Sequence, residues 1–187
     1  MTRLALLRHA DTAWSVERRI QGRTDVPLLP RASLLLPEGF GKMRIVSSPL
    51  RRCLETAALL GCRGPEREPR LAEMSWGAWE GRRLEELRAE LGEAMRDNEA
   101  RGWDFRPEGG ESPREVLARV RPWLAEVAAR GEPTLAITHR GVIRAVLAEA
   151  LGWDLRGKPP VKLDPAAVHV FRLAGDGEPK VEALNVR

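Results

Sequence analysis

Two short apolar segments of the chain end in a histidine and lead into a turn. Residues 4–7 are followed by Arg8 and His9, and residues 134–138 are followed by His139. A short apolar run ended by polar residues predicts a buried strand that reaches the edge of a sheet. In open α/β sheets, ligands bind outside the carboxyl ends of the strands. The repeated pattern therefore predicts neighbouring strands that bring both histidines to one crevice.

Other segments extend this pattern of strands and helices. Strands are predicted over residues 43–46, 70–72, 167–173 and 180–184, and helices over residues 31–36, 49–60, 82–98, 113–130 and 142–151. Their alternation implies a mostly parallel central sheet with helices on both faces. Because 187 residues suit one substantial domain, we expect an α/β fold, a three-layer sandwich, with residues 1–187 as a single domain.

Two serine-proline pairs predict helix starts. In each pair the serine is expected to cap the helix and the proline to be its first residue. Ser112 and Pro113 precede the predicted helix over 113–130, and Ser48 and Pro49 precede the one over 49–60. The second of these helices carries Arg52 in its first turn. This guanidinium is therefore expected at the same edge of the sheet as the two histidines.

Composition limits the class of protein and its partners. A hydrophobic fraction of 43% and a charged fraction of 31% are typical of a soluble globular chain, and no apolar run approaches the ~20 residues of a membrane helix. The 31 basic and 27 acidic residues form no basic stripe, so neither a membrane nor a nucleic acid is an expected partner. The first strand begins almost at Met1, which argues against a secretory signal and favours the cytoplasm. Nothing in the sequence predicts an oligomeric state.

Arg8, His9, Arg52 and His139 together predict a dense cationic pocket. A dianion such as a phosphate is its natural occupant, because arginine offers paired donors to such a group. A metal is the competing use of two histidines, but zinc and hard cations require cysteine or carboxylate ligands, and arginines would repel a metal ion. We therefore expect no metal and no cofactor.

The chain resembles the histidine phosphatase superfamily, which includes cofactor-dependent phosphoglycerate mutases. Segment 7–15 is similar to its Arg-His-Gly-Glu-Thr-x-Trp-Asn signature, and segment 47–57 to its Ser-x-Leu-x-Arg-Ala-x-x-Thr helix start. Further segments resemble the loop after the signature, the acid-bearing loop, a helix entry and the second histidine motif: 21–28, 71–73 with 79–81, 109–112 and 138–144. Matches in the same order from residue 7 to residue 144 make the resemblance specific.

The resemblance implies a role for each site residue. His9 is implied to be the nucleophile that takes the phosphoryl group, and Glu73 the general acid and base. Glu80 and Asp11 are rivals for the acid, although the tryptophan-glycine surroundings of Glu80 favour a structural role. Phosphate and substrate contacts are implied for Arg8, Ser15, Gln21, Gly22, Arg52 and His139.

Three residues depart from the pattern of this family. Ala10 replaces a glycine, which raises the question of whether the backbone there has a negative φ angle. Ser15 replaces an asparagine, and Arg140 replaces the glycine after the second histidine, where it adds charge at the pocket mouth or lies on the surface. The segment 27–42 also lacks the long helix that the family usually has there.

The leading hypothesis is a metal-independent phosphomonoesterase that acts through a phosphohistidine on a small phosphorylated metabolite. A cofactor-dependent phosphoglycerate mutase is one alternative. The shortness of the chain argues against it, because the mutases that it resembles are longer. An α-ribazole phosphate phosphatase of cobalamin synthesis is another. A non-catalytic phospholigand-binding protein would not need His9 and Glu73. Three tryptophans could stack on an aromatic leaving group or fill the core: Trp76, Trp79 and Trp103.

Overall fold

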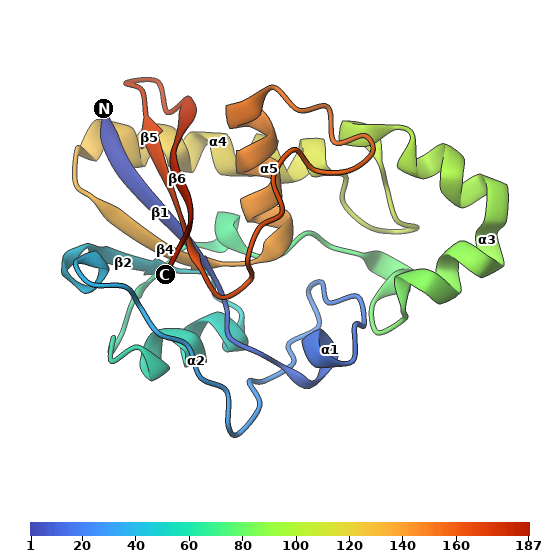
Figure 1. The fold of residues 1–187 in the computed structure, drawn as a ribbon, viewed down its shortest axis with the longest axis horizontal. Coiled ribbons are helices and arrows are strands. Elements are labelled where there is room, and N and C mark those ends of the chain that lie inside the picture. The colour runs from blue at the N-terminus through green and yellow to red at the C-terminus, as the bar shows by residue number, and fades with distance from the viewer.

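The computed structural model describes residues 1–187. Six strands form one sheet in the order β3-β2-β4-β1-β5-β6, and helices lie on both sides of it (Figure 1). The strands are β1 (Thr2–Arg8), β2 (Arg44–Ser47), β3 (Glu66–Arg67), β4 (Thr134–Thr138), β5 (Val168–Leu173) and β6 (Pro179–Val186). The α-helices are α1 (Ala13–Val16), α2 (Arg51–Leu59), α3 (Leu84–Glu99), α4 (Pro113–Arg130) and α5 (Arg140–Leu151).

The strand pairing confirms the mostly parallel sheet. The strands β3, β2, β4 and β1 run parallel, whereas β5 and β6 add an antiparallel edge. In the central pair Arg8 lies opposite Thr138, and the His9 N–H donates to the Thr138 carbonyl at 3.0 Å. His9 follows Arg8 and His139 follows Thr138, so this register brings both histidines to the same edge of the sheet.

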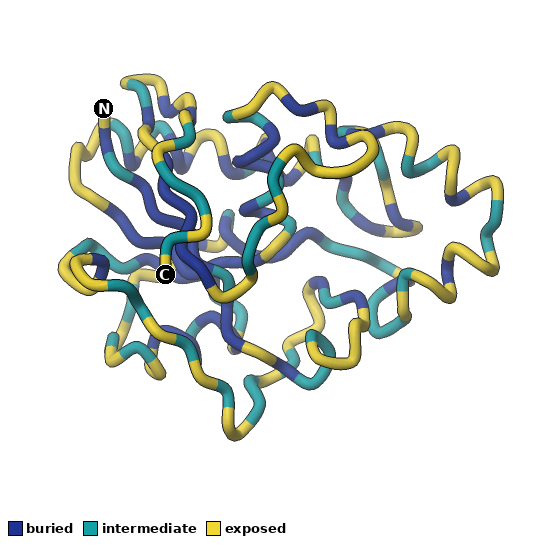
Figure 2. Tube along the Cα trace, in the orientation of Figure 1, coloured by how far each residue is buried: buried dark blue, intermediate teal, exposed yellow.

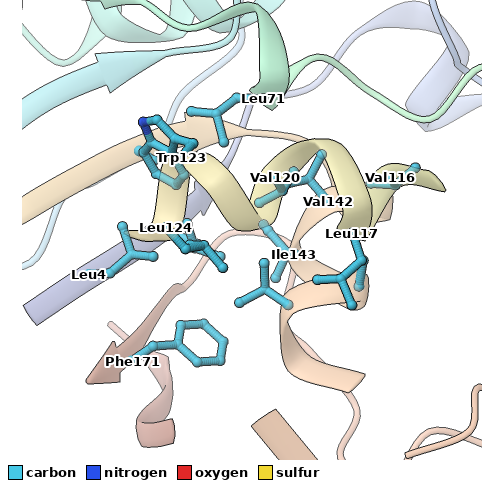
Figure 3. Packing of buried hydrophobic residues seen from close by; sticks show 14 of the residues in the cluster. Leu4, Leu71, Val116, Leu117, Val120, Trp123, Leu124, Val142, Ile143 and Phe171 are labelled. Atoms are coloured by element: carbon cyan, nitrogen blue, oxygen red, sulfur yellow. The ribbon is translucent and has the colours of Figure 1, made fainter. Parts of the chain in front are cut away.

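Alternate residues of β1 pack on opposite faces, as the twofold period of a strand requires. Leu4 and Leu6 belong to the main core cluster with α4 and α5, where Figure 3 shows Leu4 near Leu124 and Phe171. Ala5 and Leu7 belong to a smaller cluster on the opposite face. Burying one such leucine contributes about 1.5–3 kcal/mol. The central strands are accordingly buried along their length (Figure 2).

The helix α4 begins and ends as its sequence predicts. The Ser112 hydroxyl accepts from the Glu115 N–H, Pro113 is the first helical residue, and Gly131 ends the helix with a φ of 71°. Reciprocal capping of this kind satisfies backbone donors that the first helical turn leaves free. The helix α3 extends away from the sheet (Figure 1), with non-helical backbone angles at Gly92. None of the helices combines the length and the apolar character that crossing a membrane demands.

Three of the predicted helix starts are wrong by two residues, and one of them is that of α3, which begins at Leu84 instead of Arg82. The helix α2 begins at Arg51 instead of Pro49, because Leu50 is extended, and the Ser48 hydroxyl accepts from the Leu50 N–H at 3.3 Å. The Arg51 N–H instead meets the carboxylate of Asp25 at 2.8 Å, a partner from a distant loop. The helix α5 begins at Arg140, two residues before the predicted start.

Two predicted elements are absent. Residues 31–36 form no helix, because Leu34 and Leu36 both pack against the small core cluster that contains Phe40 while the intervening Leu35 is 88% exposed, an alternation typical of extended chain. The third strand is Glu66–Arg67, and the predicted strand over 70–72 is replaced by a 3₁₀ turn at Pro69–Leu71. The N–H groups of residues 70–72 all donate within this turn, to the Glu68 carboxylate, the Glu68 carbonyl and the Pro69 carbonyl, so none is left for a strand ladder.

Candidate active site

A cavity of about 750 Å³ lies at the carboxyl ends of the central strands. Arg8 and His9 from the end of β1 line it, together with Glu73 and Trp76 from the loop after β3. Exposed residues of the loop after α1 and of α3 form its outer wall, which opens the cavity to solvent: Glu17, Arg18, Arg19, Arg83, Glu85 and Arg88. The contribution of α3 is one that sequence reasoning missed, because charged residues on an amphipathic helix carry no signal of facing a site.

His9 is held as a neutral ring with one free nitrogen. Its Nδ1 lies 2.7 Å from the Ala10 carbonyl oxygen, which can only accept, so we assign the proton to Nδ1 and the lone pair to Nε2. Burial, followed by the charges of Arg8 and Arg52, lowers the pKa of His9 to about 3. At neutral pH, the Nε2 atom is therefore an unprotonated nucleophile.

Ala10 occupies its position without backbone strain. It is not among the residues with positive φ angles, so a glycine is not required there. Its N–H donates to the Thr56 hydroxyl at 3.0 Å, and that hydroxyl donates to the Arg52 carbonyl at 2.6 Å. Thr56 therefore ties the turn after β1 to α2, a role that its position in the sequence did not indicate.

Two buried donor atoms in residues that line the cavity have no protein partner. They are Nε of Arg8 and Nε2 of Gln21. Gln21 is oriented by its side-chain oxygen, which accepts from the Thr12 hydroxyl at 2.9 Å. Because buried polar groups are normally hydrogen-bonded, these two donors indicate that the cavity is built for an acceptor such as a phosphate oxygen.

Arg52 and His139 lie behind this cavity and do not line it. Both are 0% exposed, and Arg52 donates to His139 Nδ1 at 3.3 Å and to the carbonyls of Gly22 and Thr24 at 2.7 and 3.0 Å. His139 Nε2 therefore carries the proton and donates to the Ser48 hydroxyl at 2.7 Å. The rings of His139 and His9 are 5.3 Å apart. Gly22, another residue with an implied substrate contact, does not line the cavity either. Its carbonyl oxygen accepts from Arg52.

Glu73 is a buried carboxyl group inside the cavity. It is 5% exposed, and its Oε1 accepts from the Met74 and Gly141 N–H groups at 2.8 and 3.0 Å. Burial raises the pKa of Glu73, against the opposing effect of these hydrogen bonds and of Arg52 and Arg8. A raised pKa suits a group that must both give and take a proton.

Side chains of the adjoining helix entry and of α4 hold the segment around Glu73. Arg119 donates to the Ala72 carbonyl at 2.7 Å, and Glu111 accepts from the Ser75 N–H at 2.8 Å. Arg119 and Glu111 also form an ion pair at 3.0 Å. The carboxyl group is thus positioned by contacts on both sides of its own segment.

Glu80 has a different role from Glu73. Its carboxylate accepts from the N–H groups of Arg23 and Thr24, each at 2.8 Å, and from the Thr24 hydroxyl at 2.5 Å. Although burial raises the pKa of Glu80, the hydrogen bonds from Thr24, Arg23 and Trp76 lower it below its ordinary value. An ionised carboxylate with these donors clamps the loop beside the cavity and is a poor proton donor.

The clamp predicts a strict requirement for glycine at position 22. A Cβ atom there would lie 2.0 Å from Oε1 of Glu80, so we expect Gly22→Ala to lower the free energy of unfolding by about 1–3 kcal/mol. The melting temperature should fall by several degrees, and KM should rise because Gln21 moves with the loop. Gly175→Ala is the matched control, because nothing lies within 4 Å of that Cβ position. Equal melting temperatures for the two variants would contradict the clamp.

The remaining predicted residues fall into two groups. Ser15, Trp76 and Arg140 line the cavity. Ser15 also exchanges hydrogen bonds with Thr12 at the start of α1. The other rival acid, Asp11, is exposed and accepts from the Ser15 hydroxyl at 3.0 Å. Trp79 and Trp103 pack in or against the core clusters, outside the cavity.

No three His, Cys, Asp or Glu side chains gather closely enough to hold a metal ion.

Comparisons with known proteins identify the relatives of the chain. Residues 4–187 match the sequence model of the histidine phosphatase superfamily (branch 1). A glucosyl-3-phosphoglycerate phosphatase of Mycobacterium tuberculosis is 35% identical over 169 residues, covering 80% of this chain and 75% of that protein. A 2,3-bisphosphoglycerate-dependent phosphoglycerate mutase of Xanthobacter autotrophicus is 28% identical over 92% of each chain. The structure of Bacillus stearothermophilus YhfR, 28% identical, covers 100% of this chain and 98% of its own, with a TM-score of 0.81.

The length of the mutase relative tests the argument that this chain is too short to be a mutase. Because it matches over 92% of its own length, the shortness of this chain does not separate phosphatases from mutases, and that argument from the sequence is wrong. The distinction depends on the site itself.

Proposed function

Because the chain belongs to the histidine phosphatase superfamily (branch 1), we propose that it is a phosphomonoesterase that works through a phosphohistidine on His9. The observation that carries this proposal is that a neutral His9 and a Glu73 of raised pKa share one cavity. A phospholigand-binding protein without turnover would need the cations alone. We also propose that residues 1–187 act as one domain of this family, since both ends of the chain pair within one sheet.

In the proposed reaction, Nε2 of His9 attacks the phosphorus atom and the ester P–O bond breaks. Glu73 gives its proton to the leaving oxygen. Water then attacks the phosphohistidine, the P–N bond breaks, and the Glu73 carboxylate takes a proton from the water. Phosphate and alcohol are released, and both side chains return to their starting states.

The surrounding cations stabilise the charge of the transferred group. Phosphoryl transfer depends mainly on positioning and on fixed positive charge. Arg8 and Gln21 supply the free donors, and Ser15 lines the same cavity. Arg52 acts from behind as a fixed charge: it uses three of its five N–H donors on the protein, and its charge lowers the pKa of both histidines. His139 lies behind the cavity as a neutral ring.

Access of water favours hydrolysis over mutase activity. A mutase must keep water away from its phosphohistidine, but here the outer wall of the cavity consists of exposed side chains of the loop after α1 and of α3.

The substrate is a small phosphorylated metabolite, as for the mycobacterial relative named a glucosyl-3-phosphoglycerate phosphatase. Two free cysteines, Cys53 and Cys62, support the proposal that the enzyme works in the reducing cytoplasm.

Phosphate release in the presence of EDTA tests this function. We expect the purified protein to hydrolyse aryl and metabolite phosphates without loss of rate when EDTA is added. In a parallel assay, 3-phosphoglycerate with a bisphosphate primer should yield phosphate faster than 2-phosphoglycerate. Faster formation of 2-phosphoglycerate would assign the site to a mutase, and no turnover in either assay would leave only a binding protein.

A further inference from the structure

A second cavity, of about 600 Å³, adjoins the catalytic cavity. Trp76, Leu84 and Arg88 line both cavities, so the two meet at these side chains. The walls of the second cavity are largely apolar, with Met74 and Phe105 among them. It thus offers an apolar surface next to the place where the phosphoryl group would react.

The residues that hold Glu73 in place also border this second cavity. The proton donor must lie at the leaving oxygen, and the Glu73 carboxylate is held by the N–H groups of Met74 and Gly141. Both of these residues line the second cavity. Glu73 itself lines the catalytic cavity, so an alcohol whose oxygen meets its carboxyl group lies next to this second cavity.

Two arginines on one face of α5 join the cavities. Arg140 lines the catalytic cavity, and Arg144, one helical turn later, lines the second. Neither arginine forms an ion pair with a carboxylate. The acidic residue in the second cavity, Glu99, is already paired with Arg88 at 2.6 Å.

Arg144 is the more enclosed of the two arginines. Its guanidinium lies 4.9 Å from the ring centre of Trp153. Burial and the charge of Arg140 both lower the pKa of Arg144. Lys158 adds a further positive charge to the same cavity. Keeping a desolvated cation without a counter-charge costs free energy, and a bound anion would offset that cost.

We propose that the second cavity binds the leaving group of the substrate and that Arg144 binds an anionic group on it, a carboxylate or a second phosphate. This inference rests on the proposed phosphatase function and specifies its substrate class. The substrate is a phosphomonoester whose alcohol has an apolar or ring-shaped body against Trp76 and Met74. The anionic group lies at the far end of that body, away from the reacting phosphate.

Matched aryl phosphates test this inference. The probes are 4-carboxyphenyl phosphate and the longer 4′-carboxybiphenyl-4-yl phosphate, each compared with its neutral carbamoyl isostere of similar size. For at least one length, we expect the carboxylate to raise kcat/KM about tenfold, as a charge-assisted hydrogen bond would. In Arg144→Gln this ratio should fall close to one, with the carbamoyl esters still hydrolysed.

Two further variants control for folding and for general charge. Arg144→Lys keeps the charge and should retain part of the carboxylate preference. Arg130→Gln removes an equal charge from the exposed end of α4 and should leave the preference unchanged. Hydrolysis of the carbamoyl esters with no carboxylate preference at either length, or a preference that survives Arg144→Gln, would overturn the inference and leave the phosphatase function intact. Failure to hydrolyse any of the esters would instead reject the phosphatase function on which the inference rests.

Discussion

His9→Ala is expected to reduce kcat/KM for aryl phosphates by on the order of 10⁴-fold or more, as the loss of an enzyme's nucleophile does. Without Nε2 no phosphohistidine can form, although the cationic cavity still binds the ester. The measurement is phosphate release combined with transfer of ³²P from a labelled substrate to the protein. The variant should show no label in the protein.

The third histidine of the chain provides the matched control. His169 is 2% exposed and lies in β5, where its Nδ1 accepts from the Asn185 N–H at 3.3 Å. His169→Gln is expected to cost some stability but to keep both turnover and labelling. Labelling of His9→Ala at the level of the unaltered protein would assign the nucleophile to another residue.

Glu73→Gln is expected to lower kcat for an alkyl phosphate by about 10²- to 10⁴-fold, because the side chain keeps its size but can no longer exchange a proton. With an aryl phosphate that has a good leaving group, the first step needs little acid assistance. The second step still needs a base, so the phosphohistidine should accumulate. A burst of the aryl alcohol followed by slow turnover in rapid-mixing experiments would reveal this accumulation.

The pH dependence of the reaction separates Glu73 from its rival. The acid form of Glu73 acts in the first step, and burial raises its pKa, so kcat/KM for an alkyl phosphate should fall as the pH rises through that raised value. On the acid side, kcat/KM should rise through the His9 pKa of about 3. Glu73→Gln should lack the fall at higher pH, whereas Glu80→Gln should keep it and unfold at a lower temperature. The opposite pattern would make Glu80 the acid.

Local patterns predicted the elements that carry the site. The apolar runs of β1 and β4, each ended by a histidine, and the capped start of α4 depend on neighbouring residues alone, so their sequence was sufficient. Two of the failures occurred where a distant group decided the structure. Asp25 meets the first N–H of α2, and packing against the cluster that contains Phe40 keeps residues 31–36 extended.

The sequence by itself determined which residues reach the edge of the sheet. Each histidine follows a buried strand and precedes a helix, and this local order is enough to place His9 and His139 at the carboxyl edge of the sheet. The resemblance to a known family added Glu73, which no local pattern distinguishes from Glu80.

Only the tertiary structure decided what each of these groups can do. It placed Arg52 and His139 behind the cavity, left donors of Arg8 and Gln21 free, and separated a buried Glu73 from an ionised Glu80. It also joined the site to a second cavity through α5. The physical reason is that pKa values and free hydrogen-bond donors depend on burial and on distances between residues far apart in the sequence.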